Sequence, residues 1–215
     1  PVSDRPEGEL VWCHAPEPGS LLAIQDLATR LCRIRSGLRV LITIPDMPAG
    51  TTTPDPAHKD IIIDCLPEDH PAPVEQFVDY WQPDVCIWAW GRLRPNLIVA
   101  LSDRSCPMFL IDADTGGFDG KRDRWLRDLT RELLRYFSAI MARSDAGAER
   151  LIRLGVSPER IEVTPALQAG GHALPCVESD LADLSAALVG RPIWFANQLL
   201  REELNTVLTA HRQAL

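Results

Sequence analysis

The segment Leu38-Arg-Val-Leu-Ile-Thr-Ile44 is an almost continuous apolar run that is rich in β-branched residues. Such a run is typical of a strand that is buried on both faces of a parallel sheet. On its N-terminal side, apolar residues at helical spacing predict a helix that opens at Gly19-Ser20 and ends at Gly37. A further apolar run, Leu10–Ala15, precedes that helix and is predicted to be another strand. The three elements form a strand–helix–strand unit, which is the crossover that two parallel strands require.

The same alternation continues toward the C-terminus. Further strands are predicted at Asp60–Asp64, Asp84–Trp90, Pro107–Asp112, Ser138–Ala142 and Ile161–Thr164. Helices are predicted between them at Val74–Trp81, Asn96–Ser102, Arg122–Tyr136 and Asp145–Leu154. This pattern predicts an α/β fold with an open, doubly wound, mostly parallel sheet of about six or seven strands and helices on both faces.

Beyond Thr164 the pattern changes. Residues 165–177 are rich in Gly, Ala and Pro and are predicted to be a linker. A helix at 178–189, a strand at Pro192–Ala196 and a helix at Leu199–Ala214 are predicted to follow, as at the start of a second α/β domain.

Composition excludes several classes of protein. The chain has 215 residues, 46% hydrophobic and 24% charged, which are ordinary globular values. The net charge of −8 argues against bulk nucleic-acid binding. No run reaches the roughly 18 apolar residues that a membrane span needs. The six cysteines are scattered without a Cys-x-x-Cys pair, so we expect free thiols in a reducing compartment, and the sequence indicates no metal or cofactor.

Ligands of doubly wound sheets bind at the carboxyl ends of the strands, so the loops after strands are the places to search. The first such loop is His14-Ala-Pro-Glu-Pro-Gly-Ser20. Its helix-opening Gly19-Ser20 amides are one candidate for holding an anion. A rigid turn with Ser20 as the N-cap of the helix explains the same residues equally simply.

Three other features have a functional and a structural explanation each. The loop Asp112–Gly120 has carboxylates that could position hydroxyls or a metal, but it matches neither a dinucleotide fingerprint nor a P-loop, and a surface loop explains it as well. Arginines at helical spacing are either an anion-binding patch or a solvated helix face: Arg124, Arg127, Arg131 and Arg135. Aromatic and guanidinium groups near one strand end suit sugars or anions, although buried tryptophan is common in cores: Trp81, Trp88, Trp90, Arg92 and Arg94.

Four stretches resemble the 3-deoxy-D-manno-octulosonic acid (Kdo) transferases of lipopolysaccharide synthesis, which are GT-B glycosyltransferases. They are Leu10-Val-Trp-Cys-His-Ala with Gly19, Pro83-Asp-Val-Cys-Ile with Leu93-Arg-Pro-Asn-Leu97, Ala142-Arg-Ser-Asp-Ala-Gly-Ala-Glu-Arg150 with Leu154–Thr164, and Arg191-Pro-Ile-Trp-Phe-Ala196 with Glu202-Glu203 and Ala210-His-Arg212. The third stretch is the most specific, and the order and spacing match from about residue 8 to the end.

The resemblance implies a division into a Rossmann-like acceptor-binding domain at 8–165, a linker at 166–190 and the first β-α unit of a donor-binding domain at 191–215. It implies transfer of a sugar from a CMP-linked donor such as CMP-Kdo to a lipid A-like acceptor. It also implies a cytoplasmic location, peripheral to the inner membrane of a Gram-negative bacterium. A catalytically silent paralogue or fragment that binds glycolipid or protein is the alternative, and an unrelated flavodoxin-like anion-binding domain is a third.

The resemblance also assigns site residues and shows departures. The glutamate that serves the family as general base falls on Ser20, and Glu17 lies three residues earlier. A serine hydroxyl is a far weaker base than a carboxylate at neutral pH. Acceptor-binding positions are implied at His14, Gly19, Arg92, Asn96 and Ser144, although Arg92 stands where the family has a glutamate.

Overall fold

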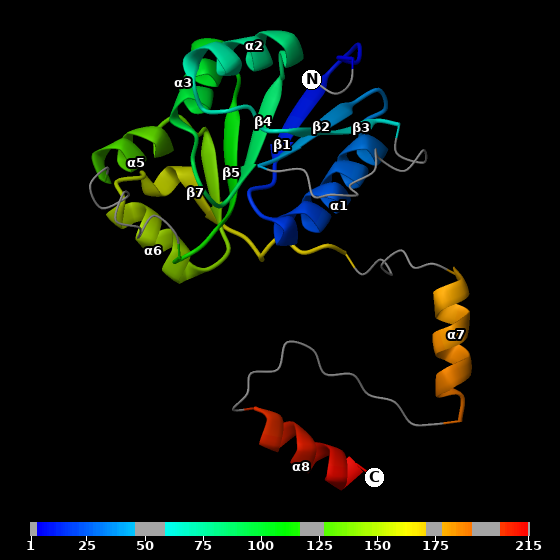
Figure 1. Cartoon of the computed structure of the whole chain (residues 1–215). Helices are drawn as coiled ribbons and strands as arrows, with labels where there is room; N and C mark the ends of the chain where they lie inside the picture. Colours follow the sequence, from blue (N-terminus) through cyan, green and yellow to red (C-terminus); the bar gives the residue numbers. More distant parts are fainter. Residues whose placement is uncertain (1–3, 46–58, 117–126, 171–177, 191–202, 215) are drawn as a thin grey trace. The chain divides into compact units, whose positions relative to one another are not determined.

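The structure is a computed structural model that describes residues 4–45, 59–116, 127–170, 178–190 and 203–214 (Figure 1). The chain divides into two compact units, Pro1–Gly171 and His172–Leu215. Each unit is described separately.

The first unit is built on a seven-stranded sheet in which every pair of neighbouring strands is parallel (Figure 1). The strands are β1 (Leu10–His14), β2 (Arg39–Ile44), β3 (Ile61–Cys65), β4 (Val85–Ala89), β5 (Met108–Ala113), β6 (Ala139–Ala142) and β7 (Ile161–Val163). Their order is β3-β2-β1-β4-β5-β6-β7. The chain therefore moves outward from β1 to β3 and then returns to the other side of β1. This arrangement confirms the predicted doubly wound, Rossmann-like α/β fold.

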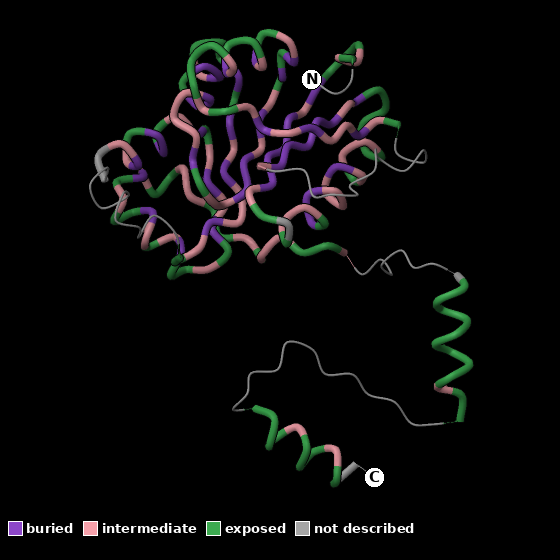
Figure 2. Tube along the Cα trace, viewed as in Figure 1, coloured by how far each residue is buried: buried purple, intermediate pink, exposed green. Residues whose placement is uncertain are grey.

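Helices cover both faces of the sheet. On one face α1 (Pro18–Ile34) packs Ile24 and Ala28 against β1 and β2. On the other face lie α2 (Pro71–Trp81), α3 (Pro95–Asp103), α5 (Arg127–Leu134) and α6 (Asp145–Arg153). Figure 2 shows that burial concentrates in the strands and in the helix sides that face them. Each fully buried Leu, Ile or Val side chain contributes roughly 1.5–3 kcal/mol, so these two apolar layers hold the first unit together.

Prolines set where several helices begin. Pro18, Pro71 and Pro95 occupy the first turns of α1, α2 and α3, where a missing N–H costs nothing. Helix α2 consequently starts at Pro71, three residues earlier than its apolar spacing predicts, and it ends where Gln82 adopts a left-handed conformation (φ 43°).

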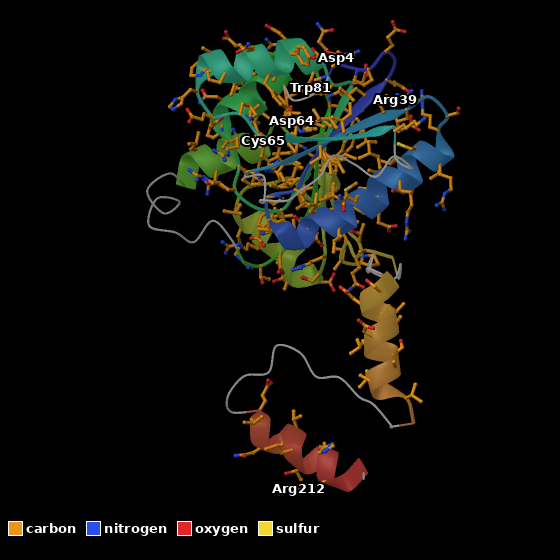
Figure 3. The ribbon with its side chains drawn as sticks, turned by 45° about the vertical axis from the view of Figure 1, so that its right-hand side comes forward. Asp4, Arg39, Asp64, Cys65, Trp81 and Arg212 are labelled. Carbon is orange, nitrogen blue, oxygen red and sulfur yellow. The ribbon has the colours of Figure 1, made fainter. Side chains whose placement is uncertain are left out.

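Three strand ends come together at the middle of the sheet. The register pairs His14 of β1 with Thr43 of β2 on one side and with Trp88 of β4 on the other. In Figure 3, Arg39 marks the amino end of β2, and Asp64 and Cys65 mark the carboxyl end of β3. The loops that carry candidate site residues leave from the carboxyl edge.

The second unit contains α7 (Glu178–Leu188) and α8 (Leu204–Ala214), whose described side chains are mostly exposed (Figure 2). The predicted strand Pro192–Ala196 lies outside the described residues. The domain boundaries 8–165, 166–190 and 191–215 therefore remain a prediction.

The cysteines and helices of the described segments bear on two expectations. Five cysteines are free thiols, as predicted, and Cys176 lies outside the described residues: Cys13, Cys32, Cys65, Cys86 and Cys106. Within the described segments, no helix has both the length and the apolar character that a membrane crossing requires.

Candidate functional site

The sheet has a topological switch point between β1 and β4, because the chain leaves β1 in one direction and returns to β4 on its other side. In open α/β sheets the crevice at such a point, outside the carboxyl ends of the strands, is where ligands bind. The loops after β1 and β4 meet here. A Cβ added at Gly91 would lie 2.6 Å from Pro16 Cγ, so glycine is what allows the two loops to touch. Strand order, which places this crevice, is not visible in the sequence.

His14 lies at the carboxyl end of β1 in this switch point. The residue is 1% exposed, and its ring centroid is 4.3 Å from that of Trp88. Its Nδ1 is 3.0 Å from Thr43 Oγ1 and 3.2 Å from Thr43 O. Burial lowers the pKa of His14 to about 3, and the nearby Arg94 guanidinium also lowers it. His14 is therefore neutral at physiological pH.

Ser20 and Glu17 lie at the start of α1, at the same edge of the sheet. The N-cap is Glu17, three residues before the serine expected to cap the helix, and Ser20 is the third helical residue. Ser20 Oγ donates to the Glu17 carbonyl at 2.7 Å and accepts from the Glu17 N–H at 3.3 Å. The hydroxyl thus stabilises the helix start, while Glu17 and Gly19 are exposed. Their predicted position at the carboxyl edge is confirmed, and their chemical roles remain predictions.

Asn96 joins two loops at the start of α3. Its Nδ2 donates to the Asp69 carbonyl at 2.7 Å, and the Leu97 N–H donates to Asp69 Oδ1 at 3.2 Å. The carboxylate of Asp69 therefore caps this helix from the loop before α2. Arg94 is half-buried at the N-cap of α3 and lies near His14. Arg92 is exposed in the loop between β4 and α3.

Ser144 caps α6 by accepting from the Gly147 N–H at 3.1 Å. Beside it, Arg143 forms an ion pair with Asp114 at 3.0 Å. The pKa of Asp114 is lowered mainly by the hydrogen bond from the Thr115 N–H, with Arg143 contributing. The charge of Asp114 in the loop after β5 is thus partly neutralised by Arg143, which follows β6, and this weakens its attraction for a metal ion. No cluster of three metal-ligating side chains occurs among the residues that the structure describes.

The tryptophans singled out in the sequence belong to the apolar core, with Trp81 and Trp88 buried in one cluster and Trp90 packed against it. Trp81 lies at the C-terminal end of α2, where its carbonyl accepts from Arg5 Nε at 2.9 Å, near Asp4 at the amino edge (Figure 3). Trp88 is buried in β4, and Trp90 donates to the Gly116 carbonyl at 2.8 Å at the carboxyl edge.

The arginine-rich helix is only partly described. Arg131 donates to the Leu154 carbonyl at 3.3 Å, and Arg135 pairs with Glu132 at 3.6 Å. Arg124 and the side chain of Arg127 lie outside the described residues. The described arginines therefore favour packing and local pairing over an open anion patch.

Thr43, Trp12 and Trp88 complete the surroundings of His14, and of these the sequence singled out Trp88 but not Thr43 or Trp12 as a candidate site residue. Thr43 offered one signal, because it is a hydroxyl within the otherwise apolar half of a buried strand. A buried hydroxyl must find hydrogen-bond partners, and here they come from β1.

The family model of 3-deoxy-D-manno-octulosonic-acid transferases (kdotransferases) matches residues 2–169, the segment that forms the sheet and its helices. The chain belongs to this family. The Kdo transferase resemblance expected from the sequence is thus confirmed.

Curated relatives of the Kdo transferase family match over nearly the whole chain. A probable mitochondrial 3-deoxy-D-manno-octulosonic acid transferase of Arabidopsis thaliana is 27% identical over 100% of this chain and 49% of its own length. The 3-deoxy-D-manno-octulosonic acid transferase of Haemophilus influenzae is 24% identical over 98% of this chain and 49% of its own. The chain spans about half the length of these curated relatives.

Solved structures support the GT-B type of fold. The Staphylococcus aureus MnaA–UDP structure matches with a TM-score of 0.53 at 13% identity, covering 74% of this chain and 44% of its own. The Anabaena HepE structure with UDP and glucose matches with a TM-score of 0.53 at 15% identity, covering 84% and 50%. At such identities the likeness concerns the fold alone.

Proposed function

We propose that this chain is the acceptor-binding half of a Kdo-transferase-type glycosyltransferase of lipopolysaccharide synthesis. The observation that carries the proposal is that the family match covers the whole sheet-bearing unit, including the switch-point loops. In this proposal the sugar comes from a CMP-linked donor such as CMP-Kdo, and the acceptor is a lipid A-like glycolipid. A donor-binding half is required for transfer, and in this proposal it begins within residues 191–215.

The acceptor side of the proposed reaction uses the carboxyl edge. His14 ends β1, Arg92 lies in the loop after β4, and Gly19 is the second residue of α1. Asn96 and Ser144 lie at the starts of α3 and α6. Guanidinium groups at positions 92 and 94 suit an acidic or phosphorylated acceptor. We place this edge toward the cytoplasmic surface of the inner membrane, as expected for a peripheral enzyme with a glycolipid acceptor.

The proposed reaction needs a general base, and the residue at the family's base position is not a carboxylate. Ser20 occupies the family's glutamate position, and both its hydrogen bonds go to the Glu17 backbone. Glu17 is an exposed carboxylate in the same loop and is the candidate that replaces the missing base. The structural use of Ser20 also favours the second candidate function, a silent paralogue that binds glycolipid without transferring sugar.

A transfer assay with radiolabelled CMP-Kdo and a lipid A precursor separates the two functions. We expect this chain alone to give no turnover, because it spans half of its relatives. Joined to a family donor-binding half, it should transfer label if it is an enzyme, and Glu17→Gln should then abolish transfer. Acceptor binding without transfer by the joined protein indicates the silent paralogue, and absence of both contradicts the proposal.

A further inference from the structure

Three side chains of β1 and β2 form a buried hydrogen-bonded chain at the switch point. Trp12 Nε1 donates to Thr43 Oγ1 at 2.8 Å, and His14 Nδ1 lies 3.0 Å from the same oxygen. Trp12 and Thr43 are 0% exposed and His14 is 1% exposed. Because Trp12 and Thr43 are fully buried, the hydrogen bonds of these three side chains with one another decide where their protons reside.

The protons can be placed by counting donors and acceptors. An indole N–H only donates, so Thr43 Oγ1 accepts from Trp12 and keeps its own proton to donate. Among the described residues, His14 Nδ1 is the acceptor recorded within reach of that proton. If Nδ1 accepts, the single proton of the neutral ring is on Nε2.

The other tautomer fits less well. A proton on Nδ1 could be donated to the Thr43 carbonyl, which is 3.2 Å away. That carbonyl already accepts from the Ala15 N–H at 2.9 Å in the β1–β2 ladder. The Nδ1 proton would also face the hydroxyl of Thr43, whose own proton would lose its recorded acceptor.

We propose that Trp12 and Thr43 are positioning residues that hold His14 as a neutral imidazole with its proton on Nε2. His14 then serves the switch point as a hydrogen-bond donor toward an acceptor oxygen and does not replace the base missing at Ser20. That the oxygen belongs to the glycolipid acceptor rests on the proposed function. The protonation state of the His14 ring is independent of the proposed function.

The surroundings of the ring support this assignment. The two nitrogens of an imidazole point to opposite sides, so Nε2 is directed away from Thr43 while Trp88 packs against the ring. Among the described residues, the Arg94 guanidinium at the start of α3 lowers the pKa of His14, and Asp64 of β3 is the register partner of Thr43. A second positive charge beside Arg94, in a buried position, is disfavoured, and a protonated Nδ1 would break the bond from Thr43.

The test is long-range ¹H–¹⁵N NMR of the whole chain labelled in histidine, which reports which ring nitrogen carries the proton. The His14 signals are assigned by their loss in His14→Gln. We expect an unprotonated Nδ1 and a protonated Nε2, unchanged between about pH 5 and pH 8, where ordinary histidines titrate. A protonated Nδ1 in the wild-type chain, or titration of His14 in this range, overturns the proposal.

Variants at position 43 test the positioning role. Thr43→Val removes the hydroxyl at similar size, and we expect the tautomer ratio to move toward Nδ1–H by about fivefold or more. Thr43→Ser should restore the wild-type ratio, and Thr130→Val, a change at another buried threonine, should leave it unaltered. An unchanged ratio in folded Thr43→Val contradicts the role of Thr43. If Thr43→Val does not fold, the wild-type and Thr43→Ser spectra decide. None of these readouts depends on sugar transfer, so failure here is distinct from failure of the proposed function.

Discussion

Several polar side chains at the carboxyl edge form hydrogen bonds that stabilise the fold, which their residue types alone do not predict. Ser20 bonds twice to the Glu17 backbone, Asn96 bonds to Asp69, and Ser144 caps α6. Each of these bonds stabilises a loop or helix start by about 0.5–1.5 kcal/mol. These candidate site residues are therefore also part of the scaffold, and their replacement must be judged by folding as well as by binding.

Gly91 gives the first prediction. We expect Gly91→Ala to lower the free energy of unfolding by about 1–3 kcal/mol, because the added Cβ would overlap the ring of Pro16. Gly19→Ala is the matched control: nothing lies within 4 Å of its Cβ position, and it is in a helix. Ala there should be neutral or stabilising by up to about 1 kcal/mol. Urea unfolding of both variants measures the difference, and equal stabilities would show that the two loops do not touch.

His14 gives the second prediction, which concerns pH. Its pKa is about 3 in the folded chain and near 6.5 when unfolded, so the unfolded state binds more protons between these values. The contribution of His14 to stability is therefore complete above about pH 6.5 and is lost as the pH falls toward 3, by about 1.4 kcal/mol per pH unit. The stability difference between wild type and His14→Gln should shrink along that slope.

The matched control for the pH prediction is Thr130→Val, because Thr130 is also buried and its side chain does not titrate. Its difference from wild type should stay nearly constant over the same pH range. Denaturant unfolding at several pH values measures both, and a flat His14→Gln difference would indicate that His14 titrates normally in the folded state.

At the scale of elements, the end of β5 and the segment after β7 are tied together. Asp112 interrupts the β5–β6 register with a left-handed backbone (φ 61°), and its Oδ1 accepts from the Leu167 N–H at 3.1 Å. Three residues later the Gly170 N–H donates to Asp26 of α1 at 3.1 Å. Two carboxylates from distant elements thus hold the last segment of the first unit.

The third prediction distinguishes the hydrogen bond between Asp112 and the Leu167 N–H from the backbone strain at Asp112. Asp112→Gly relieves the positive φ but removes the acceptor, so we expect the Leu167 amide to exchange with solvent about tenfold faster or more. Asp112→Asn keeps an oxygen acceptor and tolerates the left-handed conformation, so its exchange should stay near that of wild type. Hydrogen-exchange NMR gives both rates, and equal rates in the two variants would mean that the carboxylate does not hold this segment.

At the scale of the whole molecule, the proposed sugar transfer requires more than the first unit. The chain covers 49% of its relatives from Arabidopsis and Haemophilus, and the family match ends at residue 169. In the proposed function, a base on the acceptor half must meet a donor held by the other half. The effect of residue 20 on sugar transfer can therefore be measured only when this chain is joined to a donor-binding half.

The fourth prediction is that Ser20→Glu raises transfer in this chain joined to a family donor-binding half. A carboxylate in the first turn of α1 is favoured by the helix dipole by roughly 0.3–1 kcal/mol, so the helix should tolerate it. The same field lowers the pKa of the new carboxyl and weakens it as a base, so the gain should be partial. Ser20→Gln, of equal size without the base, is the control. No gain over Gln, with donor and acceptor bound, would contradict a base role for this position.

The sequence alone was sufficient for the strands, the doubly wound class and the family. Parallel buried strands such as β2 are recognisable because local burial demands continuous apolar runs, and the motif at Ala142–Arg150 is specific by its spacing. Local signals also placed Glu17, Gly19 and Ser20 at a helix start, since prolines and glycine act on their own neighbours.

The tertiary structure decided what no local signal contains. The order of strands brings β4 beside β1, and only that pairing makes a switch point in which His14 lies between Thr43 and Trp88. The partners of His14 are about 30 and 74 positions away and the partner of Asn96 is 27 positions away, so the neutral state of His14 and the structural role of Asn96 follow from the fold.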